Sequence, residues 1–265
     1  MKKSQLYLVI ALALVAVVGG VFFFKNKKKS ETADTKTPAR KVEQINKLAI
    51  KDRPYVVLTP RADGKEVTLT IDNVMGATNA EYEMEYTAGA MIQGVFGTID
   101  FSEEPAPVSK ELLFGSCSKG KCKYDDNVSG GSLTLRVEGQ GDPYVLKSDF
   151  NLQLMSDREG VFTSKDIKAK LDVGTSLPSS TYVVVAGTMG LPAELEGEVL
   201  AGPYSFTTAS TKAIKGNLTI QSKDDLTDAK LMFYTGTAWT ELTSALSEGK
   251  ISAPVTSLGT FVLVK

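Results

Sequence analysis

The feature that most constrains this chain is its apolar start. Residues 6–24 include no charged side chain, while Lys2 and Lys3 precede them and four lysines lie within residues 25–29. Nineteen residues in an α-helix would extend about 28 Å, close to the ~30 Å thickness of the hydrocarbon core of a bilayer. The run is apolar all round, which is not typical of a helix with one face on a core. We therefore expect residues 1–24 to form a single-pass membrane anchor.

The flanks of this segment favour an uncleaved signal-anchor. A cleaved signal peptide has a shorter apolar region followed by an Ala-x-Ala-like site. Here the small pair Gly19-Gly20 is followed by three phenylalanines and the lysine cluster. Cleavage near Gly20 remains the alternative. The lysine counts on the two flanks slightly favour a cytoplasmic body, but the cysteines and the strand content favour an extracytoplasmic one, which we expect.

The charge distribution separates a basic neck from an acidic body. Residues 25–53 carry ten basic and four acidic side chains and no apolar periodicity, which predicts a flexible neck. Its lysines either mark the membrane boundary or contact anionic lipid or cell-wall polymer. Residues 54–265 carry 18 basic and 27 acidic side chains, a net charge of −9. An acidic body argues against nucleic-acid binding, and its charge is expected to disfavour self-association.

The body has the pattern of an all-β protein. Short apolar runs alternate with turn residues, as in the Asp63-Gly64 turn between two β-branched runs and in the alternation of glutamate with Tyr82, Met84 and Tyr86. We expect two tandem antiparallel β-sandwich, immunoglobulin-like domains at residues 54–157 and 158–265. No segment after the anchor has a sustained helical period, although residues 42–50 could form a short helix.

The C-terminal half carries a resemblance to a known group of modules. Residues 218–220, 229–242 and 255–263 follow one another as a strand, a W-x-x-L hairpin and a final L-G-x-F-x-L strand. This order resembles the closing strands of ZU5-like and related β-sandwich modules of bacterial membrane-anchored surface proteins. The first half is loosely similar to immunoglobulin or fibronectin modules. The resemblance implies a spacer, assembly or adhesive setting, with Trp239 as a core or hairpin anchor.

Histidine and cysteine usage narrows the possible chemistry. The chain has no histidine, which excludes Ser-His-Asp and Cys-His catalysis and histidine-based metal sites. Its only cysteines, Cys117 and Cys122, flank a turn-forming Lys-Gly. We predict a disulfide between them, contributing about 2 kcal/mol and requiring an oxidising compartment. Two free thiols in a reducing cytoplasm are the alternative.

Three weaker patterns were weighed as sites. Residues 115–122 match the phosphate loop G-x-x-x-x-G-K-[ST] except that cysteine occupies its last position, and no apolar helix follows, so no nucleotide or other cofactor is expected. Three Ser-x-x-Lys pairs, at Ser116/Lys119, Ser118/Lys121 and Ser247/Lys250, lack the partner motifs of that chemistry. Acidic runs at residues 125–127 and 224–225 could bind calcium, but solvated turns are expected, and no metal site is predicted.

These observations predict a membrane-anchored cell-envelope or surface protein with a non-catalytic binding or assembly role. Its partners would be membrane lipid, through residues 6–24, and an envelope protein or polysaccharide. One alternative is an envelope hydrolase that uses a carboxylate pair. The other is an accessory subunit of a pilus or secretion-type assembly, joined through its edge strands.

Overall fold

A computed structural model describes residues 44–139 and 141–265. The predicted anchor, residues 1–24, and residues 25–43 of the predicted neck lie outside the described part of the chain. The described residues belong to one compact unit. Within the described ranges, no helix has the length and apolar character needed to span a membrane.

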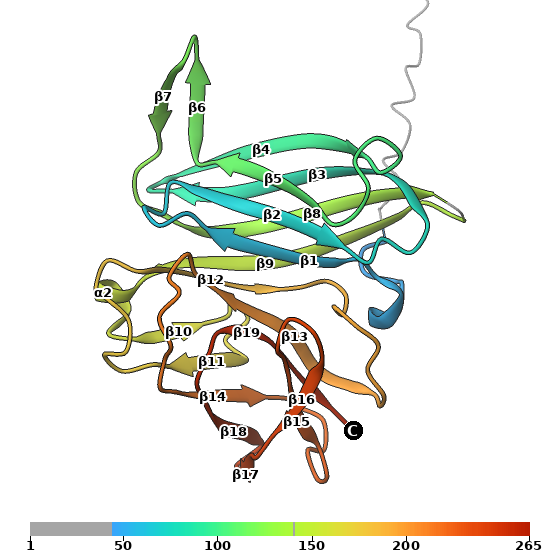
Figure 1. Cartoon of the computed structure of the whole chain (residues 1–265), viewed down its shortest axis with the longest axis vertical. Helices are drawn as coiled ribbons and strands as arrows, with labels where there is room; N and C mark the ends of the chain where they lie inside the picture. The colour runs from blue at the N-terminus through green and yellow to red at the C-terminus, as the bar shows by residue number, and fades with distance from the viewer. Residues whose placement is uncertain (1–43, 140) are drawn as a thin grey trace, which may run out of the picture. The chain divides into compact units, whose positions relative to one another are not determined.

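The predicted all-β class is confirmed, with strands that pair antiparallel in sandwiched sheets (Figure 1). The largest sheet has nine strands in the order β16-β15-β19-β13-β12-β9-β8-β3-β4. These are β16 (Trp239–Leu242), β15 (Lys230–Tyr234), β19 (Gly259–Val264), β13 (Val199–Thr207), β12 (Tyr182–Gly187), β9 (Tyr144–Leu154), β8 (Val128–Gly139), β3 (Ala77–Ala88) and β4 (Met91–Asp100).

Two smaller sheets face this large one, and the remaining elements are short. The three-stranded sheet is β1 (Tyr55–Pro60), β2 (Glu66–Asp72) and β5 (Val108–Leu113). The five-stranded sheet is β10 (Val161–Thr163), β11 (Ala169–Asp172), β14 (Gly216–Gln221), β18 (Lys250–Val255) and β17 (Ala245–Ser247). A separate hairpin is formed by β6 (Gly115–Ser118) and β7 (Lys121–Tyr124), and the helical turns are η1 (Ile50–Asp52) and α2 (Met155–Arg158).

The helix considered at residues 42–50 is wrong for its described part, residues 44–50. Ile45 forms a parallel bridge with Val145, and the backbone N–H of Asn46 donates to the carbonyl of Val145 at 2.9 Å. A backbone N–H that donates to a neighbouring strand cannot also donate to a carbonyl within a helix. Only the three-residue turn η1 follows.

The first half buries its core between the three-stranded sheet and one end of the large sheet. Alternate residues of β1 and β2 point inward, and the Asp63-Gly64 turn predicted between these strands is present. The largest fully buried side chains of this core include Phe114 and Phe150. The period-two pattern of the sequence therefore marks the buried face correctly.

The second half buries its core on the five-stranded sheet. Phe162, Leu218 and Phe206 are fully buried there, and Phe206 contacts Phe261 edge to face at 6.0 Å. Trp239 lies at the start of β16, opposite Tyr234 of β15, and its indole N–H donates to the carbonyl of Ala193 at 3.2 Å. Trp239 thus anchors a hairpin at the end of the large sheet.

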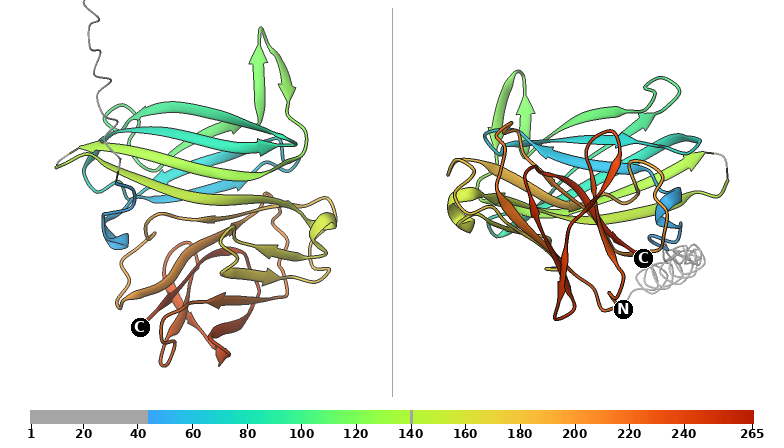
Figure 2. Two further views of the ribbon diagram at one scale, coloured as in Figure 1. Left: turned by 180° about the vertical axis from the view of Figure 1, so that it is seen from behind. Right: turned by 60° about the horizontal axis from the view of Figure 1, so that its bottom comes forward.

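The two cores lie on opposite faces of the large sheet and meet at β12. Val184 and Ala186 belong to the first core, whereas Val183 and Val185 belong to the second. The boundary expected between residues 157 and 158 lies within α2, and β12, which follows it, pairs with β9, which precedes it. The two views in Figure 2 show the halves joined through these central strands.

Candidate binding site

A two-stranded hairpin stands out from the first sandwich. β6 and β7 are joined by Lys119 and Gly120, which have φ values of 51° and 77°. Positive φ at both central residues is the geometry of a type I′ turn, the tight turn that matches the twist of paired strands. Figure 1 shows this hairpin projecting away from the sheets of the body. It is the most prominent projection among the described elements.

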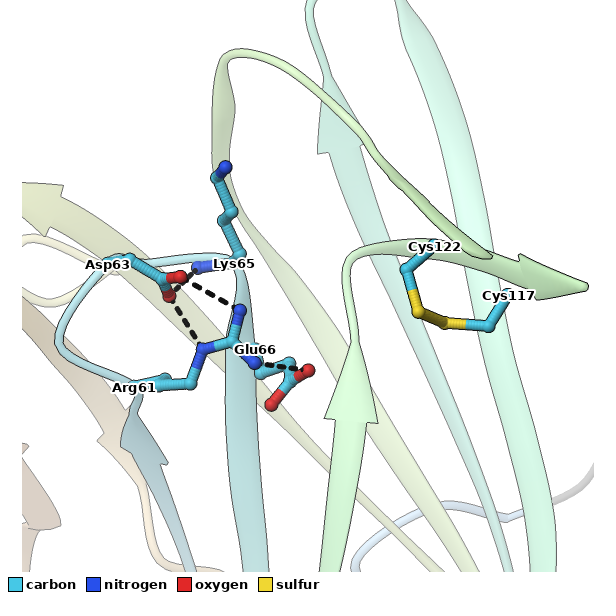
Figure 3. Close-up of polar contacts among 6 residues, drawn as sticks. All are labelled: Arg61, Asp63, Lys65, Glu66, Cys117 and Cys122. Carbon is cyan, nitrogen blue, oxygen red and sulfur yellow. Dashed lines mark hydrogen bonds and ion pairs between the residues drawn. A yellow bond between two sulfur atoms is a disulfide. The ribbon is translucent and has the colours of Figure 1, made fainter. Parts of the chain in front are cut away.

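A disulfide staples the hairpin. Cys117 and Cys122 are directly opposite each other in the register, with 4.0 Å between their Cα atoms, and their sulfurs are bonded (Figure 3). No residue from 115 to 124 is buried. The hairpin therefore draws no stability from either core, and the cross-link supplies what apolar packing supplies elsewhere.

The face opposite the disulfide is cationic. Ser116 pairs with Lys123 and Ser118 with Lys121, so by the alternation of strand side chains these four lie on the face away from the sulfurs. Lys119 occupies the tip. No carboxylate of the described residues lies within 4.0 Å of the ammonium group of Lys119, Lys121 or Lys123. Hydroxyl and ammonium donors side by side suit a carboxylate, phosphate or sulfate group.

The foot of the hairpin is fixed to the sandwich by buried contacts. Phe114, fully buried, precedes β6 and packs edge to face against Tyr86 at 4.8 Å. Its backbone N–H donates to the carbonyl of Lys65 at 3.0 Å, and its carbonyl accepts from the N–H of Asp125 at 2.9 Å. At Gly115, with a φ of 142°, a Cβ would lie 2.1 Å from the carbonyl oxygen of Lys123. The strand can therefore leave the sheet at this angle only with glycine.

A partly buried hydroxyl–carboxylate pair adds a polar contact at the same foot. The hydroxyl of Tyr86 donates to Oδ2 of Asp125 at 2.7 Å. Burial, and then this bond to a carboxylate, raise the pKa of Tyr86 well above its ordinary value. The tyrosine therefore stays protonated and keeps donating at physiological pH.

An arginine clamp in the β1–β2 turn supports the other side of the foot. Nε and a terminal nitrogen of Arg61 each donate to a carboxylate oxygen of Asp63 at 2.8 Å, and Arg61 also pairs with Glu66 (Figure 3). These bonds lower the pKa of Asp63, chiefly through the guanidinium of Arg61. Arg61 and Lys65 lie 5.5 Å and 4.7 Å from the centre of the Tyr124 ring, within cation–π range.

A groove of about 770 Å³ begins at this foot and is lined by both halves. The first half contributes Asp63, Lys65 and Asp126, and the second contributes Arg158 and Lys165. The lining thus mixes both signs of charge. A ligand crossing this groove would contact both sandwiches, and Asp125, the residue after β7, also lines it.

The weaker sequence patterns have structural explanations. The phosphate-loop match at residues 115–122 is the hairpin itself, so no helix N-terminus follows it to receive a phosphate. Ser118 and Lys121 are paired across the β6–β7 turn, and Ser247 and Lys250 across the β17–β18 turn. A two-residue hairpin turn places residues i and i+3 opposite each other, which is the spacing of the Ser-x-x-Lys pattern.

Asp225, in one of the acidic runs considered for calcium, and Glu104, in another acidic turn, each have a lysine partner. Asp225 lies 3.1 Å from the ammonium of Lys265, and hydrogen bonds from Thr227 together with that contact lower its pKa to about 2. Glu104 forms an ion pair with Lys110 at 2.6 Å. Within residues 44–139 and 141–265, no three His, Cys, Asp or Glu residues gather as a metal-binding group.

Comparison with known proteins gives no relative for this chain, since neither a family model nor a curated protein matches it. The function must therefore be argued from the site. The sequence indicated the cysteines and the turn, but not Arg61, Lys65 and Tyr124 at the foot. The cationic face of the hairpin did have a sequence signal, because Lys119, Lys121 and Lys123 alternate with the two-residue period of a strand face.

Proposed function

We propose that this protein is a membrane-anchored component of the cell envelope that binds an anionic partner through the β6–β7 hairpin, without catalysis. The observation that carries the proposal is the combination of a projecting, disulfide-stapled hairpin and an unpaired cationic face on a body of net charge −9. The same proposal includes the anchor at residues 6–24, an extracytoplasmic body and the resemblance to tandem immunoglobulin-like surface modules.

The energetics of the hairpin support a role in binding. A solvated two-stranded hairpin is marginally stable in water, and this one gains nothing from core burial. The disulfide and the foot contacts hold it in one conformation before a partner arrives. Preorganisation of this kind lowers the ordering cost of binding. A cationic tip on an acidic body also directs an anionic partner to one place.

The test measures binding of the full chain in detergent to alginate, an acidic polysaccharide, with neutral dextran as a comparison polymer. We expect binding to alginate that weakens as salt rises, because exposed charges are screened beyond about 10 Å at 0.1 M ionic strength. Replacing Lys119, Lys121 and Lys123 with glutamine should abolish it.

The matched control replaces Lys212, Lys215 and Lys223, three exposed lysines of the second half, with glutamine. This triple change alters net charge equally and should leave binding intact. Equal losses in both variants would show that only overall charge matters, and an unchanged hairpin variant would contradict the proposal.

A further inference from the structure

Strand β4 is the outer strand at one end of the nine-stranded sheet, and its outer edge has no strand partner among the described residues. It is ten residues long, and its stretch from residue 91 to residue 99 contains neither a charged residue nor a proline. Proteins normally protect such edges with lysine, proline or a covering loop. Residues 91–99 contain neither lysine nor proline, and no described strand pairs with this edge.

The same strand exposes two large apolar side chains on one face. Ile92 is 76 % exposed and Phe96 is 83 % exposed, and they are four positions apart along the strand, so both project from the same side of the sheet. They lie opposite Thr87 and Glu83 of β3 respectively, and therefore face away from the first core. Phe96 is the most exposed large apolar side chain among the residues described.

The two glycines of β4 have different explanations. A Cβ at Gly97 would lie 2.3 Å from the hydroxyl of Tyr82, so packing within the chain requires glycine there. A Cβ at Gly94 would meet nothing closer than the carbonyl oxygen of Met84 at 3.8 Å, an ordinary contact. The fold of one chain therefore gives no reason for glycine at the midpoint between Ile92 and Phe96.

We propose that two copies of this chain pair through β4, antiparallel, about a twofold axis at Gly94. This register places Ile92 of each copy opposite Phe96 of the other, so that all four exposed side chains gain cross-strand partners. Pairs of an aromatic with a β-branched residue are among the stabilising ones in antiparallel sheets. Gly94 meets its own copy at the axis, where absent side chains let the Phe96 rings lie over the glycines.

Electrostatics permits this pairing despite the acidic body. No charged residues oppose each other within the paired stretch. The nearest acidic row, Glu81, Glu83 and Glu85, lies one strand further in on β3. The two copies of this row would be three strand spacings apart, about 14 Å, which exceeds the screening length of about 10 Å at 0.1 M salt.

The experiment is cysteine cross-linking of the full chain in its own membranes. Gly94→Cys places two sulfhydryls at the axis, where directly opposite Cα atoms lie about 4.5–5.5 Å apart, within the range of a disulfide. The native cysteines are bonded to each other within the chain. We expect mild oxidation to convert most of the variant into a covalent dimer on a non-reducing gel.

Thr98→Cys is the matched control on the same strand and face. In this register the two copies of residue 98 lie eight residues apart along the strand, about 27 Å, so no dimer should form. A second arm co-expresses Ile92→Cys with Phe96→Cys, which should cross-link together but not singly. Equal cross-linking at residue 98, no dimer at residue 94, or a Gly94→Cys adduct with a different protein would each overturn the pairing.

Discussion

Val184 and Val185 are consecutive residues of β12, and their side chains are buried in two different cores. Because strand side chains alternate between faces, a run of four buried residues in one strand means that both of its faces are covered. β12 is therefore the element that the two sandwiches share. Both cores therefore pack against the large sheet, one on each of its faces.

This sharing predicts that the body unfolds in one transition. Leu69→Ala removes a fully buried side chain of the first core and should cost about 2–5 kcal/mol. Trp239, the single tryptophan, lies in the second half and reports that half by fluorescence. Leu69→Ala should lower the urea concentration at the unfolding midpoint, relative to the unmodified protein, by the same amount whether unfolding is followed by Trp239 fluorescence or by circular dichroism. Leu218→Ala, in the second core, is the control that should behave alike. A Trp239 transition unmoved by Leu69→Ala would instead support separate domains divided at residue 157.

The disulfide gives a prediction about compartment. Protein isolated without reductant should resist alkylation at Cys117 and Cys122, because the extracytoplasmic location that we propose is an oxidising environment. Mass spectrometry before and after reduction makes the measurement. The Cys117→Ser/Cys122→Ser double variant should lose no more than about 2 kcal/mol of unfolding free energy, the effect expected for so small a loop, as measured by Trp239 fluorescence. Its binding to alginate should weaken. Two alkylated thiols in fresh material would argue for a reducing cytoplasm.

Tyr86, at the foot of the hairpin, makes the stability of the fold depend on pH. Burial and the hydrogen bond to Asp125 raise its pKa in the folded protein, so the stability contributed by the protonated tyrosine is fully present below the unfolded tyrosine pKa of about 10. It is lost as the pH rises from there toward the higher pKa of the folded state. Tyr86→Phe should cost about 1.5–3 kcal/mol near neutral pH, the range for a hydrogen bond to a charged group. Its stability should also fall less steeply above pH 10 than that of the unmodified protein.

A double-mutant cycle with Asp125→Asn isolates this contact, because urea midpoints of the two single variants and the double variant give the coupling directly. Strictly additive losses would mean that the bond contributes nothing beyond the packing of each side chain.

The N-terminal segment predicts a membrane-bound mature protein that keeps residues 1–24. Sequencing of protein from the membrane fraction should begin at Met1 or Lys2. Deleting residues 1–24 should move the chain out of that fraction. A mature N-terminus near Gly20 or Val21 would identify a cleaved signal peptide.

Local structure was predictable because its causes are local. The Asp63-Gly64 turn, the alternation along β3 and the tight turn at Lys119-Gly120 each follow from residues within a few positions. The shared sheet was not predictable in this way. An apolar run such as residues 182–186 indicates a buried strand, but not that its two faces meet different cores. The Arg61 clamp beneath Tyr124 likewise joins residues more than sixty positions apart, a distance over which a single sequence carries no pairing signal.

The sharing of β12 also fixes an order of folding events during synthesis. The first core includes Val184 and Ala186, so it remains open along β9 until residue 187 has emerged. The second core must wait longer, because β19 lies between β13 and β15 and ends one residue before the C-terminus. A chain synthesised from its N-terminus thus presents an unfinished, apolar sheet to its surroundings until β19 has emerged. Keeping that sheet apart from other chains in the interval is a task for molecular chaperones.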